Sequence, residues 1–471
     1  MTCGDVRDAV LRLPGGPAGS SVSAVSSTRE PGPVGPAAAR SALPASSYPI
    51  ERARLDNGLR VLLAPDRTAP VVAVSVHYDV GFRSEPEGRT GFAHLFEHLM
   101  FQGSENVGKA EHPKHVQAAG GIFNGSTHPD YTDYFELLPS GALELALFLE
   151  ADRMRAPKIT RQNLDNQIAV VQEEIRVNVL NRPYGGFPWI RLPPVAFDTF
   201  PNAHNGYGDF SELAAASLDD AEDFFDKYYA PGNAVLTIVG DIDPAQALGF
   251  VERYFGSIPA RTVPPRASFA EPVPTSERRS SITDALAPRA ALAVGYRVPD
   301  PIGDLSTYLA YYLLTEVLTD GDASRLERRL VQKDRSVLGV STYLGTFGNP
   351  FDQRDPLLLT LDARQSEDAS ADAVLTAVDE ELSRLAHDGL AAGELERVQA
   401  RVASSLLREA DDALGRALAM AVHELYRGRA ELVNELPAEL AAVTGEAVAA
   451  AAGSLLTQGR SVLELRAGAA S

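Results

Sequence analysis

The segment HLFEH at positions 94–98 places two histidines and a glutamate within a single helical turn. If the segment is helical, the imidazoles of His94 and His98 lie one turn apart and can both point at a metal ion about 2 Å away. Glu97 then lies beside the same ion, where its carboxylate can act as a general base. This arrangement favours metal-assisted hydrolysis of an amide bond.

The neighbouring residues predict a helix from about Gly91 to Phe101, with Thr90 as its N-cap and Gly103 beyond its end. One face of this helix is apolar, and the opposite face carries all three ionisable groups. Burying those groups unpaired would be costly, and a metal ion removes the conflict. The alternative, two ordinary surface or core histidines, is the better interpretation of a single histidine, but the grouping of three residues favours a metal site.

A catalytic zinc ion usually has three protein ligands, so one ligand must come from elsewhere. Residues 163–180 predict a long helix with a buried apolar stripe. On this helix Glu174 lies about 80° from the centre of the stripe, whereas Glu173 lies about 180° from it. We therefore expect Glu174 to reach a buried cleft as the third ligand, with Glu173 as the less favoured alternative on the solvent side.

The composition excludes several classes of function. The 471 residues carry a formal net charge of −20, which repels phosphate backbones and anionic membrane surfaces, so we expect no nucleic-acid or membrane partner. Cys3 is the only cysteine, so any metal must bind to His, Asp or Glu. Neither an apolar stretch long enough to span a bilayer nor the apolar core of a secretory signal is found, and we expect a cytoplasmic protein.

The chain is too long for one compact domain. We expect a disordered Ala/Pro/Ser/Gly-rich tail at 1–48, an N-terminal catalytic domain at 49–258, a linker at 259–281 and a second domain at 282–471. Both domains show strand and helix periodicity in a similar order, which indicates an α+β fold with a duplicated unit. Residues 72–80 alternate between apolar and polar types, which predicts a half-buried strand with His77 on its polar face.

The chain resembles the pitrilysin/insulinase family of metallopeptidases, which has the same inverted motif and a distal glutamate ligand. The distance along the chain from His98 to Glu174 matches that family, as does the sequence VVQEEI at 170–175. The segments GGIFNGST at 120–127 and YAPGNA at 229–234 also resemble it. The resemblance implies one zinc ion per chain, bound by His94, His98 and Glu174, with Glu97 as the base.

The same resemblance implies how a substrate is held. Asn124, Gly125 and Thr127 lie in the segment that resembles the family's substrate-binding edge strand, although Asn124 is also a common turn former. Gln167 stands where many relatives have a glutamate that supports a metal ligand. The implied fold is α+β with two similar domains, each an antiparallel sheet flanked by helices, forming half of a clamshell dimer.

One departure from the family concerns the second domain. Where relatives place an Arg and a Tyr that hold the substrate, this chain has Val331 and Leu338, which cannot donate the required hydrogen bonds. Arg328, Arg335 and Tyr343 are nearby substitutes. The simpler interpretation is a heterodimer in which a paralogue supplies the pair, with a homodimer as the alternative. We therefore expect a zinc peptidase that acts on extended peptides; the other hypothesis is a non-catalytic subunit of a complex.

Overall fold

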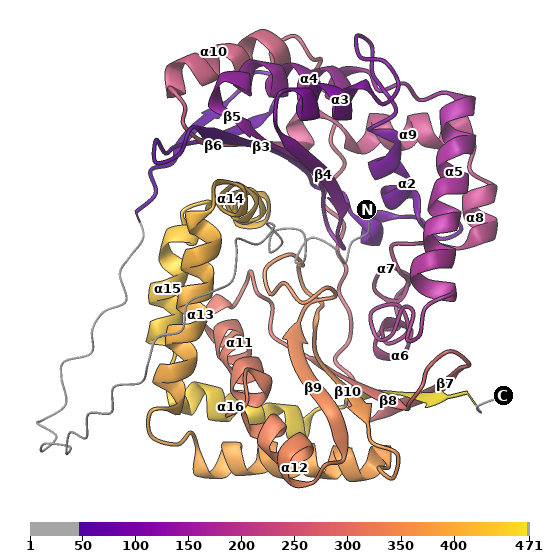
Figure 1. The fold of residues 1–471 in the computed structure, drawn as a ribbon, viewed down its shortest axis with the longest axis vertical. Helices are drawn as coiled ribbons and strands as arrows, with labels where there is room; N and C mark the ends of the chain where they lie inside the picture. The colour runs from indigo at the N-terminus through magenta and orange to yellow at the C-terminus, as the bar shows by residue number, and fades with distance from the viewer. Residues whose placement is uncertain (1–46, 469–471) are drawn as a thin grey trace, which may run out of the picture.

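Two mixed β-sheets organise the chain, as seen in a computed structural model that describes residues 47–468 (Figure 1). The tail expected at 1–48 lies outside the described residues except for its last two positions. The first sheet has the strand order β1-β2-β6-β3-β5-β4. Its strands are β1 (Glu51–Arg54), β2 (Arg60–Pro65), β3 (Val71–Tyr78), β4 (Ile122–Thr127), β5 (Thr132–Pro139) and β6 (Ala234–Gly240).

The second sheet repeats this topology. Its order is β7-β11-β8-β10-β9, which matches β2-β6-β3-β5-β4 strand for strand. Each sheet is antiparallel except for one parallel pair, β2 with β6 and β7 with β11, because β6 inserts between β2 and β3 and β11 inserts between β7 and β8. The strands are β7 (Arg278–Asp284), β8 (Ala291–Arg297), β9 (Val337–Leu344), β10 (Leu358–Gln365) and β11 (Ser461–Ala467). The fold is therefore α+β with two similar units, as predicted.

Helices flank both sheets. Those of the first half are α2 (Phe92–Leu99), α3 (Glu111–Ala118), α4 (Leu143–Arg155), α5 (Arg161–Ile175), α6 (Pro193–Ala196), α7 (Phe200–Ala203), α8 (Phe210–Ala214), α9 (Leu218–Tyr228) and α10 (Pro244–Phe255). Those of the second half are α11 (Leu305–Thr319), α12 (Ala371–Asp388), α13 (Glu394–Asp411), α14 (Ala413–Arg427), α15 (Leu432–Ala442) and α16 (Gly445–Thr457). Between α10 and β7 the chain forms neither helix nor strand.

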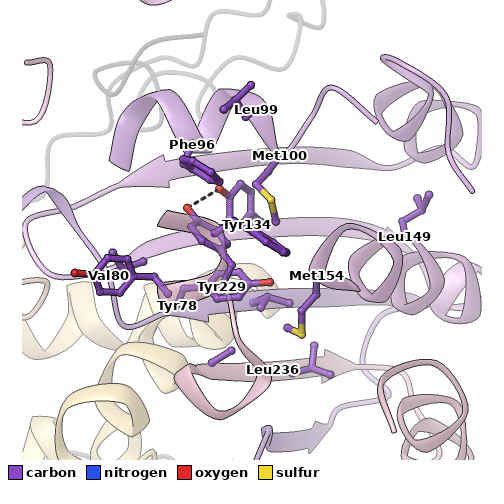
Figure 2. Close-up of a cluster of buried hydrophobic side chains, with 14 of the residues drawn as sticks. Tyr78, Val80, Phe96, Leu99, Met100, Tyr134, Leu149, Met154, Tyr229 and Leu236 are labelled. Carbon is purple, nitrogen blue, oxygen red and sulfur yellow. Dashed lines mark hydrogen bonds between the residues drawn. The ribbon is translucent and has the colours of Figure 1, made fainter. Parts of the chain in front are cut away.

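The main core of the first half lies between its sheet and α2 (Figure 2). Phe96 of α2 packs against the ring of Tyr229, with ring centroids 5.3 Å apart. Tyr78 and Tyr134 meet the same ring from neighbouring strands, and the hydroxyls of Tyr134 and Tyr229 are 3.3 Å apart. The apolar face of α2 is thus fixed by large aromatic contacts, which orients its opposite, ionisable face.

The expectation of a half-buried strand, with His77 on its polar face, was wrong about the burial. The strand β3 is covered on both faces because α14, from the second half, packs across β3 and β6 (Figure 1). His77 is only 1% exposed and stacks on Tyr131. The alternation of residue types along β3 is real, but the second face is covered by a helix that begins more than 300 residues later in the sequence.

The covering is reciprocal. Residues of the first half that follow the metal-site helix α5, among them Phe187, Leu192 and Phe197, pack against β8, β10 and β11 of the second sheet. Short helix α6 contacts β7 and β11 directly (Figure 1). Each half of the chain therefore buries part of the other half's sheet.

The start of α2 differs from the sequence expectation. Gly91, with φ of 84°, is the N-cap residue and makes no side-chain cap, so Thr90 does not cap the helix. The buried carboxylate of Glu85 instead accepts hydrogen bonds from the backbone N–H groups of Gly91 and Ala93, at 2.9 and 2.7 Å. This carboxylate also contacts His204, which replaces local capping with a tertiary contact.

Within residues 47–468 we find no individual helix with both the length and the apolar character required to cross a membrane. The pair α15 and α16 meets those criteria only when taken together, and it is bent by 87°.

Candidate metal centre and active site

The helix α2 brings His94 and His98 together. Their Nε2 atoms lie 3.3 Å apart, both on the face opposite the aromatic core. The long helix α5 packs against α2 and adds Glu174, whose Oε2 atom lies 3.7 Å from Nε2 of His94 and 3.4 Å from Nε2 of His98. Glu173 instead points to solvent and pairs with Arg176. The structure thus brings Glu174, and not Glu173, to the two histidines.

These distances fit one zinc ion. Three donors held tetrahedrally at about 2.0–2.1 Å from zinc lie about 3.3–3.4 Å from one another. Two imidazoles and one carboxylate are also a donor set that zinc accepts in catalytic sites, with a fourth position left open. The side chains converge from two packed helices, so this metal-binding arrangement is rigid.

The protonation states of His94 and Glu174 suit a metal site. Burial lowers the pKa of His94 to about 3, which keeps its ring in the neutral form that binds metals. Burial alone would raise the pKa of Glu174, but the hydrogen bond and charge of His98 and the charge of His94 lower it overall. The carboxylate of Glu174 is therefore ionised.

Glu97 lies on the same face of α2 but outside this group of three ligand atoms. Its Oε2 atom accepts a hydrogen bond of 2.7 Å from the hydroxyl of Thr127. Burial raises the pKa of Glu97, although the neighbouring His98 and the Thr127 hydroxyl act in the opposite direction. A half-buried carboxylate with a raised pKa, oriented by a hydroxyl, can accept and release a proton.

The strand β4 runs along this side of α2 as the free edge of the first sheet. Gly125 faces Glu97 so closely that an added Cβ would lie 3.3 Å from the Cγ atom of Glu97. The absence of a side chain at Gly125 lets Glu97 and Tyr134 pack closely against this strand. Asn124 is half-buried one residue earlier, and its role in substrate binding stays a prediction.

Two further side chains support the ligands. Gln167 is buried on α5 and hydrogen-bonds to His98, at the position expected for a ligand's partner. Tyr207 donates a hydrogen bond of 3.2 Å to Oε1 of Glu174, and its ring meets the ring of His94 edge-on. Sequence reasoning missed Tyr207, because nothing in the local sequence NGYG indicates a contact with a residue 33 positions away.

The described residues contain one other group of possible ligand atoms, from His112, Glu136 and Glu150. The guanidinium of Arg153 lies within this group, bonded to Glu150 and 3.8 Å from Glu136. Its positive charge occupies the place that a cation would need. The group is a closed, buried charge network to which His112 of α3 belongs.

The positions expected for a substrate clamp lie in the second half. Leu338 is 61% exposed on the edge strand β9, and Val331 packs partly against the second core. Arg328 and Arg335 are exposed to solvent. Tyr343 lines a pocket together with Trp189, whose ring contacts Tyr207. Of the three substitutes, Tyr343 is the one that lines a pocket together with a residue in contact with Tyr207.

Comparison with known families agrees with this geometry. Residues 60–183 match the family described as "Insulinase (Peptidase family M16)", and residues 215–402 match "Peptidase M16 inactive domain". The chain belongs to the M16 peptidase family. The first match contains all three expected ligands and Glu97, and the second covers much of the half that lacks the metal motif. Duplication followed by loss of the motif in one copy accounts for both matches.

M16 relatives include proteins named as zinc proteases. The chain is 30% identical over 288 residues to the zinc protease PqqE of Helicobacter pylori, a match that spans 60% of this chain and 64% of that protein, less than two thirds of its length. It is 25% identical over 417 residues to the uncharacterized zinc protease YmxG of Bacillus subtilis, which covers 87% of this chain and 96% of that protein. A crystal structure of a protease from Helicobacter pylori has the same fold, with a TM-score of 0.81 at 23% identity, covering 89% of this chain and 99% of that chain.

Proposed function

We propose that this chain is a zinc-dependent peptidase that hydrolyses peptide bonds in extended or unfolded polypeptides. The observation that carries the proposal is the convergence of His94, His98 and Glu174 within 3.3–3.7 Å, next to the half-buried carboxylate of Glu97. These three side chains would hold the metal ion. Zinc in such a site supplies a Lewis acid that activates water and polarises a substrate carbonyl.

The remaining chemistry belongs to side chains and backbone of this chain. Glu97 takes a proton from the attacking water and gives it to the leaving amine. Because the hydroxyl of Thr127 holds Oε2 of Glu97, Oε1 is the oxygen that faces the water. The free edge of β4 binds the substrate backbone as an added strand, and Gly125 lets Glu97 lie directly against that strand. A folded protein cannot present such a strand, so the substrate must be extended.

The test is peptide hydrolysis with metal analysis of the same preparations. We expect the full chain to bind one zinc ion and to lose hydrolysis when treated with a chelator. Glu97→Gln should keep the metal and lose at least about a hundredfold in hydrolysis, the usual contribution of a positioned general base. Glu174→Gln should weaken metal binding, whereas Glu173→Gln, on the exposed side of the same helix, is the control and should change neither property.

Two results would exclude this mechanism. One is undiminished metal binding after His94→Ala together with His98→Ala. The other is full hydrolysis by Glu97→Gln. If the wild-type chain binds metal but cuts no peptide, alone or with a paralogue, the alternative of a non-catalytic subunit takes the place of the peptidase.

A further inference from the structure

The general base is held by the end of the edge strand. Thr127, whose hydroxyl bonds to Glu97, is the last residue of β4, and the turn 128–131 follows it directly. Any displacement of this turn moves the Thr127 hydroxyl relative to the carboxylate. The contacts that fix the turn therefore decide where Glu97 points.

A loop of the second half contacts this turn. Residues 345–356, between β9 and β10, reach across to the first half. The Oδ2 atom of Asp352 lies 3.1 Å from Nδ1 of His128, and the backbone N–H of Arg354 donates a bond of 2.7 Å to the carboxylate of Asp130. Both contacts join residues 224 positions apart, and Asp130 and Asp352 are completely buried.

Helix α14 also contacts this loop and holds it in place. Tyr426 of α14 donates a bond of 3.1 Å to the backbone carbonyl of Asp352, and its ring meets the ring of Tyr131 in the turn. Phe347 of the same loop meets the ring of His128 edge-on. The loop is therefore packed between α14 and the end of β4, and these contacts restrict its movement.

The order Ser126, His128, Asp352 has the geometry of a nucleophile, base and acid, with 2.9 Å between Oγ of Ser126 and Nε2 of His128. The Ser126 hydroxyl, however, donates its proton to Asp133 and receives a bond from His128. Burial would lower the pKa of His128, but the bond and charge of Asp352 raise it overall, which favours the protonated ring. This set is a structural ion cluster, not a second nucleophile.

We propose that Asp352 and His128 are positioning residues for Glu97. The loop at 345–356 holds the β4–β5 turn, the turn holds the Thr127 hydroxyl, and the hydroxyl orients the base. The half of the chain without a metal motif thereby contributes to the reaction without touching substrate. The expected change in kcat rests on the proposed function, whereas the expected effect of the loop on β4 does not.

The experiment uses the full chain, with any partner chain that the wild type requires, and compares Asp352→Asn with Asp355→Asn. The control lies in the same loop but bonds to Arg297 and is partly exposed. Asp352→Asn should lower kcat by about tenfold or more while KM and metal content change by less than about twofold, because a small misplacement of a catalytic group acts mainly on turnover. Asp355→Asn should leave all three quantities near wild type.

Two further readouts separate positioning from a general loss of structure. In the double variant with Thr127→Val, the Asp352→Asn effect should disappear, since residues acting through one another are not additive. Amide hydrogen exchange at 122–127 should accelerate in Asp352→Asn and in a second variant, His128→Gln, but not in the control.

Full additivity with Thr127→Val, or unchanged exchange at 122–127 in both folded variants, would overturn the inference. Absence of hydrolysis by the wild type would refute the proposed function instead, and the exchange data would still decide whether the loop fixes β4.

Discussion

At the scale of single residues, Tyr207 makes the site contact that the sequence motif indicates least. Its hydroxyl binds the oxygen of Glu174 that is not turned to the histidines. Tyr207→Phe should weaken zinc affinity by about tenfold or more, the usual effect of removing a partner that orients a ligand. A competition titration with a fluorescent chelator measures this. Tyr254→Phe, which removes a hydroxyl bonded to Glu144 far from the site, is the matched control and should leave affinity unchanged.

The sequence predicted the site residues whose positions follow from helical geometry. His94 and His98 are set by a spacing of one turn, and Glu174 by its angle to the apolar stripe of its own helix. The contacts from Thr127 to Glu97 and from Tyr207 to Glu174 depend on how distant segments pack, so no local pattern indicates them. The family resemblance drew attention to Thr127 as a substrate contact, and the structure adds its bond to the base.

At the scale of elements, α14 makes a pH-dependent contribution to stability through His423. This residue is buried, and burial lowers its pKa to about 3, below the value near 6.5 of an unfolded chain. Its contribution is fully present above about pH 6.5 and is lost as the pH falls from there towards about 3. Between pH 7 and pH 5, the free energy of unfolding of the wild type should therefore fall by about 2 kcal/mol more than that of His423→Phe.

Urea unfolding at the two pH values measures this difference. His387→Phe is the control, because the side chain of His387 is exposed to solvent at the end of α12. An equal pH dependence in His423→Phe and wild type would show that the His423 ring is accessible to protons in the folded chain.

Elements were predictable where their own residues determine them. The helix expected from about Gly91 to Phe101 was predicted to within two residues at each end, because its apolar residues have helical spacing. The burial of both faces of β3 was missed, since the second face is covered by α14. The strands β7, β9 and β11 were also missed, because their residues are partly polar and partly exposed and are ordered by pairing with neighbours.

At the scale of the whole molecule, the replacement of the expected clamp predicts dependence on a second, different chain. Val331 and the exposed Leu338 donate no hydrogen bonds, and a homodimer would repeat this deficiency. We expect the isolated chain to hydrolyse peptides weakly and to gain about tenfold or more when a paralogue with an Arg and a Tyr at these positions is added, since each lost hydrogen bond to a charged donor is worth about 1.5–3 kcal/mol.

Co-purification with a tagged paralogue, followed by assays of each chain and of the mixture, measures this gain. Tyr343→Phe tests the main alternative within the chain. Full turnover by the isolated wild type, lost in Tyr343→Phe, would assign the clamp to Tyr343 and remove the need for a partner.

The reciprocal covering of the two sheets makes the peptide link between the halves dispensable. The sheet of each half has a face that only the other half shields, with α14 over β3 and β6 and Phe187, Leu192 and Phe197 over the second sheet. The connecting segment exposes Val273, where a cut would cross no helix or strand.

Fragments 47–273 and 274–468, expressed apart, should each aggregate, because each leaves a broad apolar face open to water. Refolded together, they should reconstitute a particle that binds zinc and elutes at the size of the uncut chain. Soluble, zinc-binding fragment 47–273 on its own would show that α14 is an accessory to the first half and not part of its core.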